Sequence, residues 1–131
     1  MFVSKATNEL IGKVPLSTRD EMETAVNSCK EAYKSWSKTT PMHRQQVMFK
    51  LQHLIKENLK DIAKNITYEQ GKTLPDAEGD VMRGLQVVEH ACSLTFMQMG
   101  NALPGIAKDM DCVSMRSPLG VTAGITPFNS I

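Results

Sequence analysis

The first candidate for chemistry is Asn129, which lies near the end of the stretch GVTAGITPFNSI, Gly120 to Ile131. The β-branched and apolar run from Val121 to Ile125 predicts a buried strand, and the asparagine follows directly after it. An amide at the tip of a strand can donate a hydrogen bond to a developing negative charge. Asparagine at the end of a strand is also a common turn former, and its spacing alone favours the turn.

Arg83 is the second candidate. It lies two positions after Val81 and therefore off the main apolar stripe of its predicted helix, with Gly79 and Gly84 near it. Most arginines on helices are solvated, and that is one interpretation. A guanidinium beside such small residues can instead bind a carboxylate through two parallel hydrogen bonds. The residues alone leave both interpretations open.

Other side chains that often take part in catalysis lack the neighbours they would need. Cys29 and Cys92 lie on apolar helix faces, where a free cysteine packs as a small hydrophobic side chain. Gly71-Lys72-Thr73 matches the end of a phosphate-binding loop, but Ile66 stands where that loop has its first glycine, so a helix-ending glycine explains it better. No metal site is expected, because a zinc site needs three or four convergent groups and the sequence indicates no such set around its histidines: His43, His53 and His90.

The composition indicates one globular domain. The chain has 131 residues, of which 41% are hydrophobic and 22% charged, with a formal net charge of +1. No basic face is evident, so nucleic acid is not an expected partner. No apolar run approaches the roughly 18 residues of a membrane span, and the first residues do not resemble a targeting sequence. Three widely spaced cysteines argue against a disulfide framework and for a reducing compartment.

The element pattern begins with short strands and turns over residues 1–16 and continues with helices over residues 17–100. Thr18 and Glu21 form a capping box at the start of the first helix. Its apolar face follows i, i+3, i+4 spacing: Met22, Ala25, Val26, Cys29, Ala32, Tyr33 and Trp36.

Three further helices are predicted. One begins at Thr40-Pro41, the next is capped by Asn58 and ends at a left-handed Gly71, and the last runs from Thr73 toward Gly100. The last helix is expected to bury one stripe: Ala77, Val81, Leu85, Val88, Cys92 and Thr95.

Residues 105–131 are predicted to form strands. Side chains alternate from Cys112 to Arg116 as in a half-exposed strand, and Val121 to Ile125 form a second, more buried one. Because a lone strand or hairpin cannot satisfy its backbone groups, these strands need partners in a sheet. The sequence therefore indicates an α/β fold in which a helical region leads to the start of a sheet.

Two stretches resemble the aldehyde dehydrogenase family. PLGVTAGITPFN, Pro118 to Asn129, is similar to a family motif in which a P-x-G-V strand leads to P-[WF]-N-F-P. EQGKTLPDAEGDVMRGLQVVEHA, Glu69 to Ala91, is similar to the stretch upstream of it, and ATNELIGKVP fits the family's opening. The combined motifs, from Ala6 to Asn129, are most similar to the CoA-acylating branch that acts on methylmalonate semialdehyde. The resemblance implies that the chain supplies the N-terminal helical region and the first strand of a dinucleotide-binding domain.

The resemblance also implies roles for individual residues. Asn129 corresponds to the asparagine that helps to form the oxyanion hole. Arg83 corresponds to the arginine that holds the substrate carboxylate. The implied ligands are NAD, CoA and a small semialdehyde, with no metal. Four residues before the asparagine are expected to contact the nicotinamide cofactor: Ile125, Thr126, Pro127 and Phe128.

The resemblance extends only to the N-terminal portion of the family, and the chain reads Asn129-Ser130-Ile131 where the family continues N-F-P. The family's nucleophilic cysteine and glutamate base have no counterpart in these residues, so we expect no turnover from them alone. One interpretation is a fragment of an NAD-dependent semialdehyde dehydrogenase of valine and pyrimidine catabolism. The other is a non-catalytic helical module, or a truncated isoform, that binds a full-length subunit.

The family further implies a mitochondrial location and a homo-oligomer. Because no targeting sequence is recognised, a cytosolic location is the alternative. Assembly of the fragment by itself is not expected.

Overall fold

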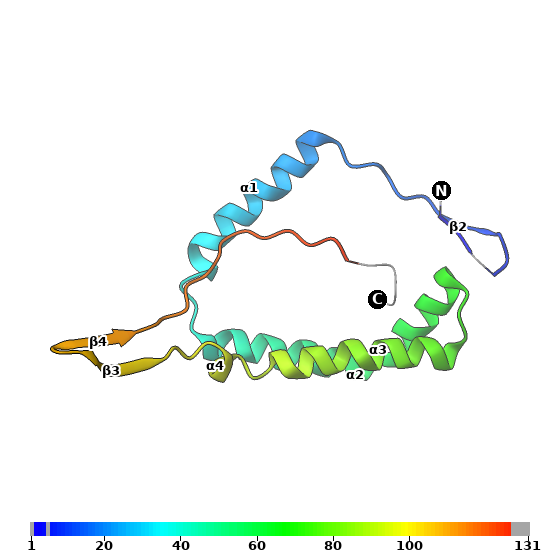
Figure 1. The fold of residues 1–131 in the computed structure, drawn as a ribbon. Coiled ribbons are helices and arrows are strands. Elements are labelled where there is room, and N and C mark those ends of the chain that lie inside the picture. Colours follow the sequence, from blue (N-terminus) through cyan, green and yellow to red (C-terminus); the bar gives the residue numbers. More distant parts are fainter. Residues whose placement is uncertain (1, 5, 127–131) are drawn as a thin grey trace.

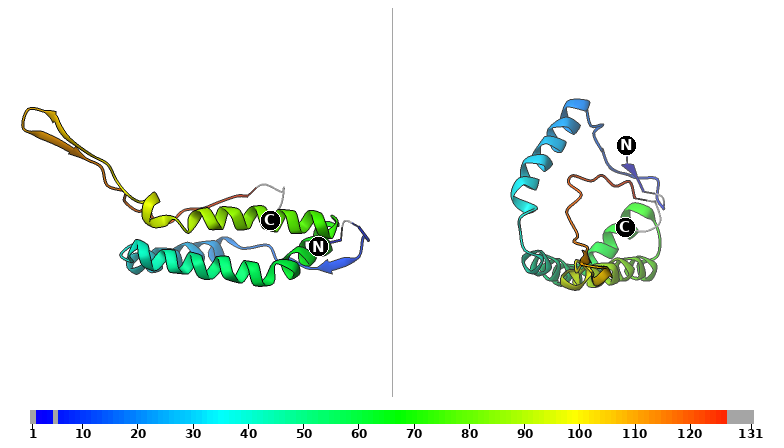
Figure 2. Two further views of the ribbon diagram at one scale, coloured as in Figure 1. Left: turned by 90° about the horizontal axis from the view of Figure 1, so that it is seen from below. Right: turned by 60° about the vertical axis from the view of Figure 1, so that its left-hand side comes forward.

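The computed structural model describes residues 2–4 and 6–126. Its helices lie on two sides of an open arrangement (Figure 1). Helices α2 and α3 lie side by side, α1 lies apart from them, and residues 114–126 run between α1 and this pair (Figures 1 and 2). The elements follow the order β1 (Phe2–Val3), β2 (Leu10–Gly12), α1 (Arg19–Trp36), α2 (Pro41–Gln70), α3 (Leu74–Ala91), α4 (Leu94–Met97), β3 (Ala102–Ala107) and β4 (Met110–Val113).

Helix α1 begins at the predicted capping box. The Thr18 hydroxyl accepts a hydrogen bond from the Glu21 backbone N–H at 3.3 Å, and the Glu21 carboxylate accepts one from the Thr18 N–H at 2.7 Å. None of its residues is buried, so the apolar stripe that includes Met22, Cys29 and Trp36 lies largely open. The helix therefore forms where predicted, but most of its apolar face is left uncovered by the described residues, and at its end the Trp36 ring packs edge-on against His43 of α2 with the ring centres 6.2 Å apart.

Helix α2 corrects the prediction of two helices between Thr40 and Gly71. A single helix runs from Pro41 to Gln70, and Asn58 is an interior residue whose side-chain amide donates to the Leu54 carbonyl at 2.8 Å. Neither proline nor glycine interrupts residues 42–70, so nothing local ends the helix. Its apolar side chains continue through this region and pack against the core: Ile55, Leu59, Ile62 and Ile66.

Helix α3 carries the core but stops at Ala91, short of the predicted Gly100. Ala77, Val81 and Leu85 are buried as predicted, and Ala63 of α2 packs against Ala77 and Val81. The helix ends here because two hydrogen bonds stabilise the turn that follows it. The Ser93 hydroxyl donates to the His90 carbonyl at 2.7 Å, and the Gln45 side-chain amide donates to the Cys92 carbonyl at 2.6 Å. A short α4 follows. Among the described residues, no helix combines the length and hydrophobicity needed to cross a bilayer.

The β3–β4 hairpin projects away from the helices (Figure 2). Strand β4 overlaps the predicted alternating segment, whereas β3 was not predicted; Ala102 lies opposite Val113 and Ala107 opposite Met110. Residues 114–126 form no regular structure, which corrects the predicted strand from Val121 to Ile125. Within the described residues no strand lies beside this segment, and an extended segment without a neighbour cannot complete a ladder.

Gly71 ends α2 in the predicted left-handed conformation, with a φ of +83° and its N–H bonded to the Thr67 carbonyl at 2.8 Å. A Cβ at this position would lie 3.1 Å from both the Cβ and the backbone nitrogen of Ala6. We expect Gly71→Ala to lower the free energy of unfolding by about 1–2 kcal/mol, because L-residues are strained at this φ.

The measurement is thermal unfolding of the chain followed by circular dichroism. Gly124→Ala is the matched control, because Gly124 has no positive φ and nothing lies within 4 Å of the added Cβ. Equal midpoints for the two variants would contradict the assignment of strain to Gly71.

Candidate functional site

The start of α3 and the turn before it bring three charged side chains together: Lys72, Asp80 and Arg83, called here the Asp80 triad. Asp80 is only 2% exposed. The Lys72 ammonium donates to its Oδ2 and the Arg83 guanidinium Nη2 donates to its Oδ1. Each carboxylate oxygen therefore has a cationic donor, and the triad carries one net positive charge at the surface of the helix pair.

Helical spacing places these groups. Asp80 lies three residues after Ala77 and one before Val81, so it falls on the buried face of α3. Arg83 lies three residues further along α3, at an exposed position beside this face, and its guanidinium reaches back to Asp80. Lys72 comes from the turn that the left-handed Gly71 opens, eight residues before the carboxylate. The end of α2 and the start of α3 are thus joined through a buried anion.

The Arg83 side chain is 68% exposed, in contrast to its partner. Its Nη1 lies 3.7 Å from the position that a Cβ would take at Gly79, so the guanidinium lies beside this glycine as the sequence indicated. Its bond to Asp80 uses one of five N–H donors, and within the described residues no other hydrogen bond to Arg83 is formed. Binding of a carboxylate by the remaining donors stays a prediction.

The hydrogen bond from Lys72 holds the pKa of the Asp80 carboxyl below its usual value of 3.8. Burial acts in the opposite direction, and the charge of Lys72 and the contact with Arg83 add to the lowering. A carboxyl with a lower pKa in the folded state binds fewer protons there than in the unfolded state. Its contribution to stability is therefore complete well above pH 3.8 and is lost as the pH falls through the lowered value.

We expect Asp80→Asn to weaken the dependence of stability on pH in the acid range. The wild-type chain should lose stability as the pH falls below about 4, because protonation removes the anion from two cations. Urea unfolding at a series of pH values between 7 and 3 measures this slope. Asp76→Asn is the control, since Asp76 is an exposed residue in the first turn of the same helix. Parallel pH profiles for the wild type and Asp80→Asn would contradict the expectation.

The predicted cofactor residues lie on a different segment. Ile125 is fully exposed and Thr126 is exposed, both in irregular backbone, whereas Pro127, Phe128 and Asn129 lie outside the described residues. Within the described part of the chain, no hydrogen bond or ion pair joins Arg83 to Ile125 or Thr126. The roles of Arg83 and of this segment in one site therefore stay predictions.

Sequence reasoning missed Asp80 and Lys72. The apolar pattern of α3 identifies Ala77 and Val81 but does not single out Asp80, the polar residue that shares their buried face. A carboxylate at this position with an arginine at i+3 is a local signal that could have found the pair. Lys72 lies within Gly71-Lys72-Thr73, where no local pattern indicates an ion pair with a residue eight positions on. The helix-cap interpretation of that stretch is confirmed.

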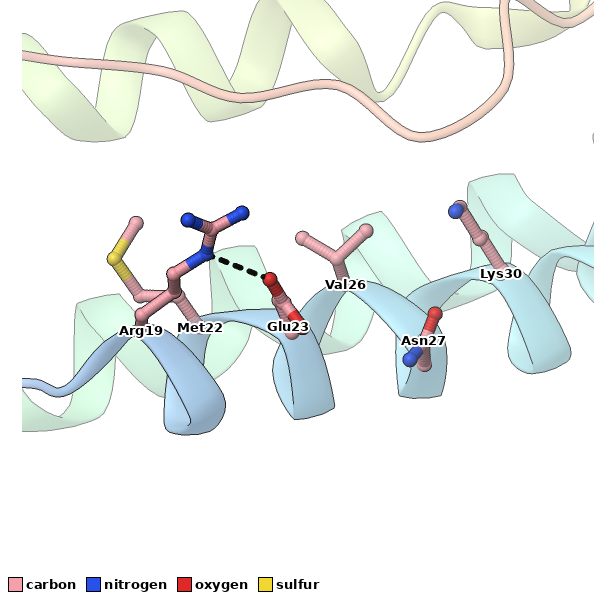
Figure 3. A pocket seen from close by; sticks show the side chains of 6 residues that line it. All are labelled: Arg19, Met22, Glu23, Val26, Asn27 and Lys30. Carbon is pink, nitrogen blue, oxygen red and sulfur yellow. Dashed lines mark hydrogen bonds and ion pairs between the residues drawn. The ribbon is translucent and has the colours of Figure 1, made fainter.

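An open groove of about 470 Å³ lies along one face of α1 (Figure 3). Its polar residues include Arg19 and Glu23, which form an exposed ion pair at 2.9 Å. The remaining lining side chains come from the same helix: Met22, Val26, Asn27 and Lys30. Within the described residues, no group of three His, Cys, Asp or Glu side chains is arranged to hold a metal ion. The groove therefore presents an apolar stripe edged by charges, without a nucleophile or a paired base.

Curated relatives match nearly the whole chain. It is 66% identical over 124 residues to a probable methylmalonate-semialdehyde/malonate-semialdehyde dehydrogenase [acylating], mitochondrial, of Aedes aegypti, a match that covers 95% of this chain and 24% of the relative. The Homo sapiens methylmalonate-semialdehyde/malonate-semialdehyde dehydrogenase [acylating], mitochondrial, is 64% identical over the same length, with 95% and 23% covered. The chain thus spans about a quarter of the length of these relatives.

Solved structures share the arrangement of the elements. A putative methylmalonate-semialdehyde dehydrogenase from Sinorhizobium meliloti, complexed with NAD, superposes with a TM-score of 0.91 at 36% identity, covering 98% of this chain and 26% of its own. A methylmalonate-semialdehyde dehydrogenase from Oceanimonas doudoroffii gives 0.85 at 28% identity, covering 91% and 25%. Residues 2–130 also match the aldehyde dehydrogenase family. With its helical region and small sheets arranged as in these enzymes, the chain belongs to the aldehyde dehydrogenase family.

Proposed function

We propose that this chain supplies the N-terminal part of an NAD-dependent, CoA-acylating methylmalonate/malonate-semialdehyde dehydrogenase. The observation that carries the proposal is the 66% identity to the Aedes aegypti relative over 95% of the chain. Supporting it, the S. meliloti enzyme complexed with NAD has nearly the same backbone over 98% of the chain. The relatives are named as mitochondrial, and we propose the same compartment for this protein.

Arg83 would recognise the substrate. A semialdehyde of this class carries a carboxylate beside its aldehyde, and Arg83 offers an exposed guanidinium with four N–H donors that bind no described residue. Two parallel N–H···O bonds to a carboxylate fix both its position and its orientation. The net positive charge of the Asp80 triad favours an anionic ligand over a neutral aldehyde of the same size.

Asn129 would act on the reacting carbonyl. When a thiolate attacks an aldehyde, the carbonyl oxygen gains negative charge, and an amide N–H donor stabilises that charge more than it stabilises the ground state. NAD, when bound, accepts a hydride from the aldehyde carbon. Exposed Ile125 and the hydroxyl of Thr126 are suited to such a ligand, because a planar ring needs an apolar contact surface and an edge donor. Pro127 and Phe128 are proposed to complete that contact.

The test is a chimera in which this chain replaces the corresponding segment of the Aedes aegypti relative. We expect purified chimera to form NADH and an acyl-CoA from malonate semialdehyde, NAD and CoA. The unaltered relative is the positive control. The 131 residues alone are the negative control, because the family's nucleophilic cysteine and glutamate base have no counterpart in them. A folded chimera without activity, beside an active control, would refute the proposal.

A further inference from the structure

The carboxylate of Asp80 lies on the same helix as Arg83 and holds its guanidinium through an ion pair. It is almost fully buried, and each of its oxygens accepts a hydrogen bond from a cation. A buried carboxylate that lost one of these partners would be left with an uncompensated charge, so the contact to Arg83 is strongly favoured. Asp80 therefore holds the exposed guanidinium at one defined point.

The ion pair with Asp80 restricts the conformations of the Arg83 side chain before a ligand binds. An arginine side chain that is 68% exposed would otherwise sample many rotamers, and a ligand would have to restrict them on binding. The bond from Nη2 to Asp80 restricts the side chain beforehand, and Nη1 lies beside Gly79, where no side chain crowds it. Restriction before binding improves affinity because less conformational entropy is lost when the ligand arrives.

Lys72 offsets the negative charge that Asp80 would otherwise place beside the substrate. A carboxylate beside Arg83 would attract the guanidinium and at the same time repel an incoming anionic substrate. Lys72 donates to the other oxygen of Asp80 and offsets its charge, so that the triad keeps one net positive charge. The guanidinium can therefore be held in place without losing its attraction for an anion.

We propose that Asp80, supported by Lys72, is a positioning residue that holds the Arg83 guanidinium ready for the carboxylate of the substrate. This inference rests on the proposed function, in which Arg83 binds that carboxylate. It adds a specificity role for two residues that contact Arg83 or its anchor and not the substrate.

The test is Asp80→Asn in the chimera, with kcat/KM measured for malonate semialdehyde and for propanal, a neutral aldehyde. The substitution raises the net charge around Arg83, so an effect of charge alone would favour the semialdehyde. Loss of the positioning contact would instead lower kcat/KM for the semialdehyde relative to that for propanal. We expect the ratio of the two kcat/KM values to fall about tenfold, the scale of a single charge-assisted hydrogen bond.

Matched variants make the result decisive. Asp76→Asn should leave the ratio unchanged, because this exposed carboxylate on the same helix forms no ion pair with Arg83. If Asp80→Asn does not fold, Asp80→Ala replaces it, because it removes the same charge and buries no polar group, and it should also lower the ratio. An unchanged or increased ratio in a folded Asp80→Asn or Asp80→Ala chimera would overturn the positioning role.

Failure of the inference can be told apart from failure of the proposed function by Arg83→Gln. If Arg83→Gln lowers the ratio and Asp80→Asn does not, Arg83 binds the carboxylate without needing its anchor, and only the positioning role is wrong. If Arg83→Gln leaves the ratio unchanged, the proposed role of Arg83 is wrong and the inference falls with it.

Discussion

Asn129→Ala in the chimera is expected to slow acylation of the enzyme by about 10²–10³, the usual cost of removing one oxyanion donor. The amide meets a charge that exists only after thiolate attack, so its loss should lower the rate of this step while substrate affinity changes little. The measurement is a single turnover in which NADH formation is followed in the absence of CoA. Transfer of the acyl group to CoA then cannot mask the first step.

Ser130→Ala is the matched control for Asn129, because it removes a neighbouring polar group of the same segment. We expect this variant to acylate at nearly the wild-type rate. A single-turnover rate for Asn129→Ala within a factor of two or three of the wild type would assign Asn129 to the turn instead of the oxyanion hole.

Arg83→Ala is expected to raise KM for malonate semialdehyde by about ten- to a hundredfold, the range for hydrogen bonds to a charged group. The substrate carboxylate is present before and after attack, so its loss of binding should appear mainly in KM. KM for propanal should stay close to that of the wild type, because propanal has no carboxylate. Steady-state kinetics with both aldehydes measure the contrast.

Arg19→Ala provides the control for a general effect of removing a cation. Arg19 is an exposed arginine at the start of α1 that pairs with Glu23 at 2.9 Å, and it takes no part in the Asp80 triad. We expect its KM values for both aldehydes to match the wild type. If Arg83→Ala weakened both aldehydes equally, Arg83 would be a structural arginine held by Asp80, and the proposed carboxylate site would be wrong.

Signals that act over three or four residues were sufficient to locate most helix ends. Thr18, Thr40 and Thr73 each cap a helix at the predicted position by accepting a hydrogen bond from the backbone N–H three residues on. The left-handed Gly71 ends α2 at the predicted position, and its backbone N–H donates to the Thr67 carbonyl. All partners in these motifs are neighbours in the chain, so no tertiary contact is needed to define them.

The identity of the family also lies in the sequence. Stretches from Ala6 to Asn129 indicated the aldehyde dehydrogenase family and its CoA-acylating branch, and the matches to relatives and to solved structures confirm this resemblance. The match of a chain to relatives four times its length also agrees with the expectation of an N-terminal portion.

Other features depend on residues that are distant in sequence. Asn58 lies inside a helix whose neighbouring apolar side chains, Ile55 and Leu59, pack against the core that α2 and α3 share, and the end of α3 is stabilised by Gln45 from α2. The apolar run from Val121 to Ile125 has strong strand propensity but no neighbouring strand within the described residues, and β-structure requires such a neighbour.

The sequence by itself determined the helix caps, the apolar faces, the family and the choice of Arg83 and Asn129 as candidates. Only the tertiary structure showed that Arg83 shares a buried anion with Lys72. Burial against α2 makes that anion dependent on both cations, and burial is a property of the packed helices. Local pattern reports which face of a helix is apolar, whereas the partner of each polar group on that face is set by what packs against it.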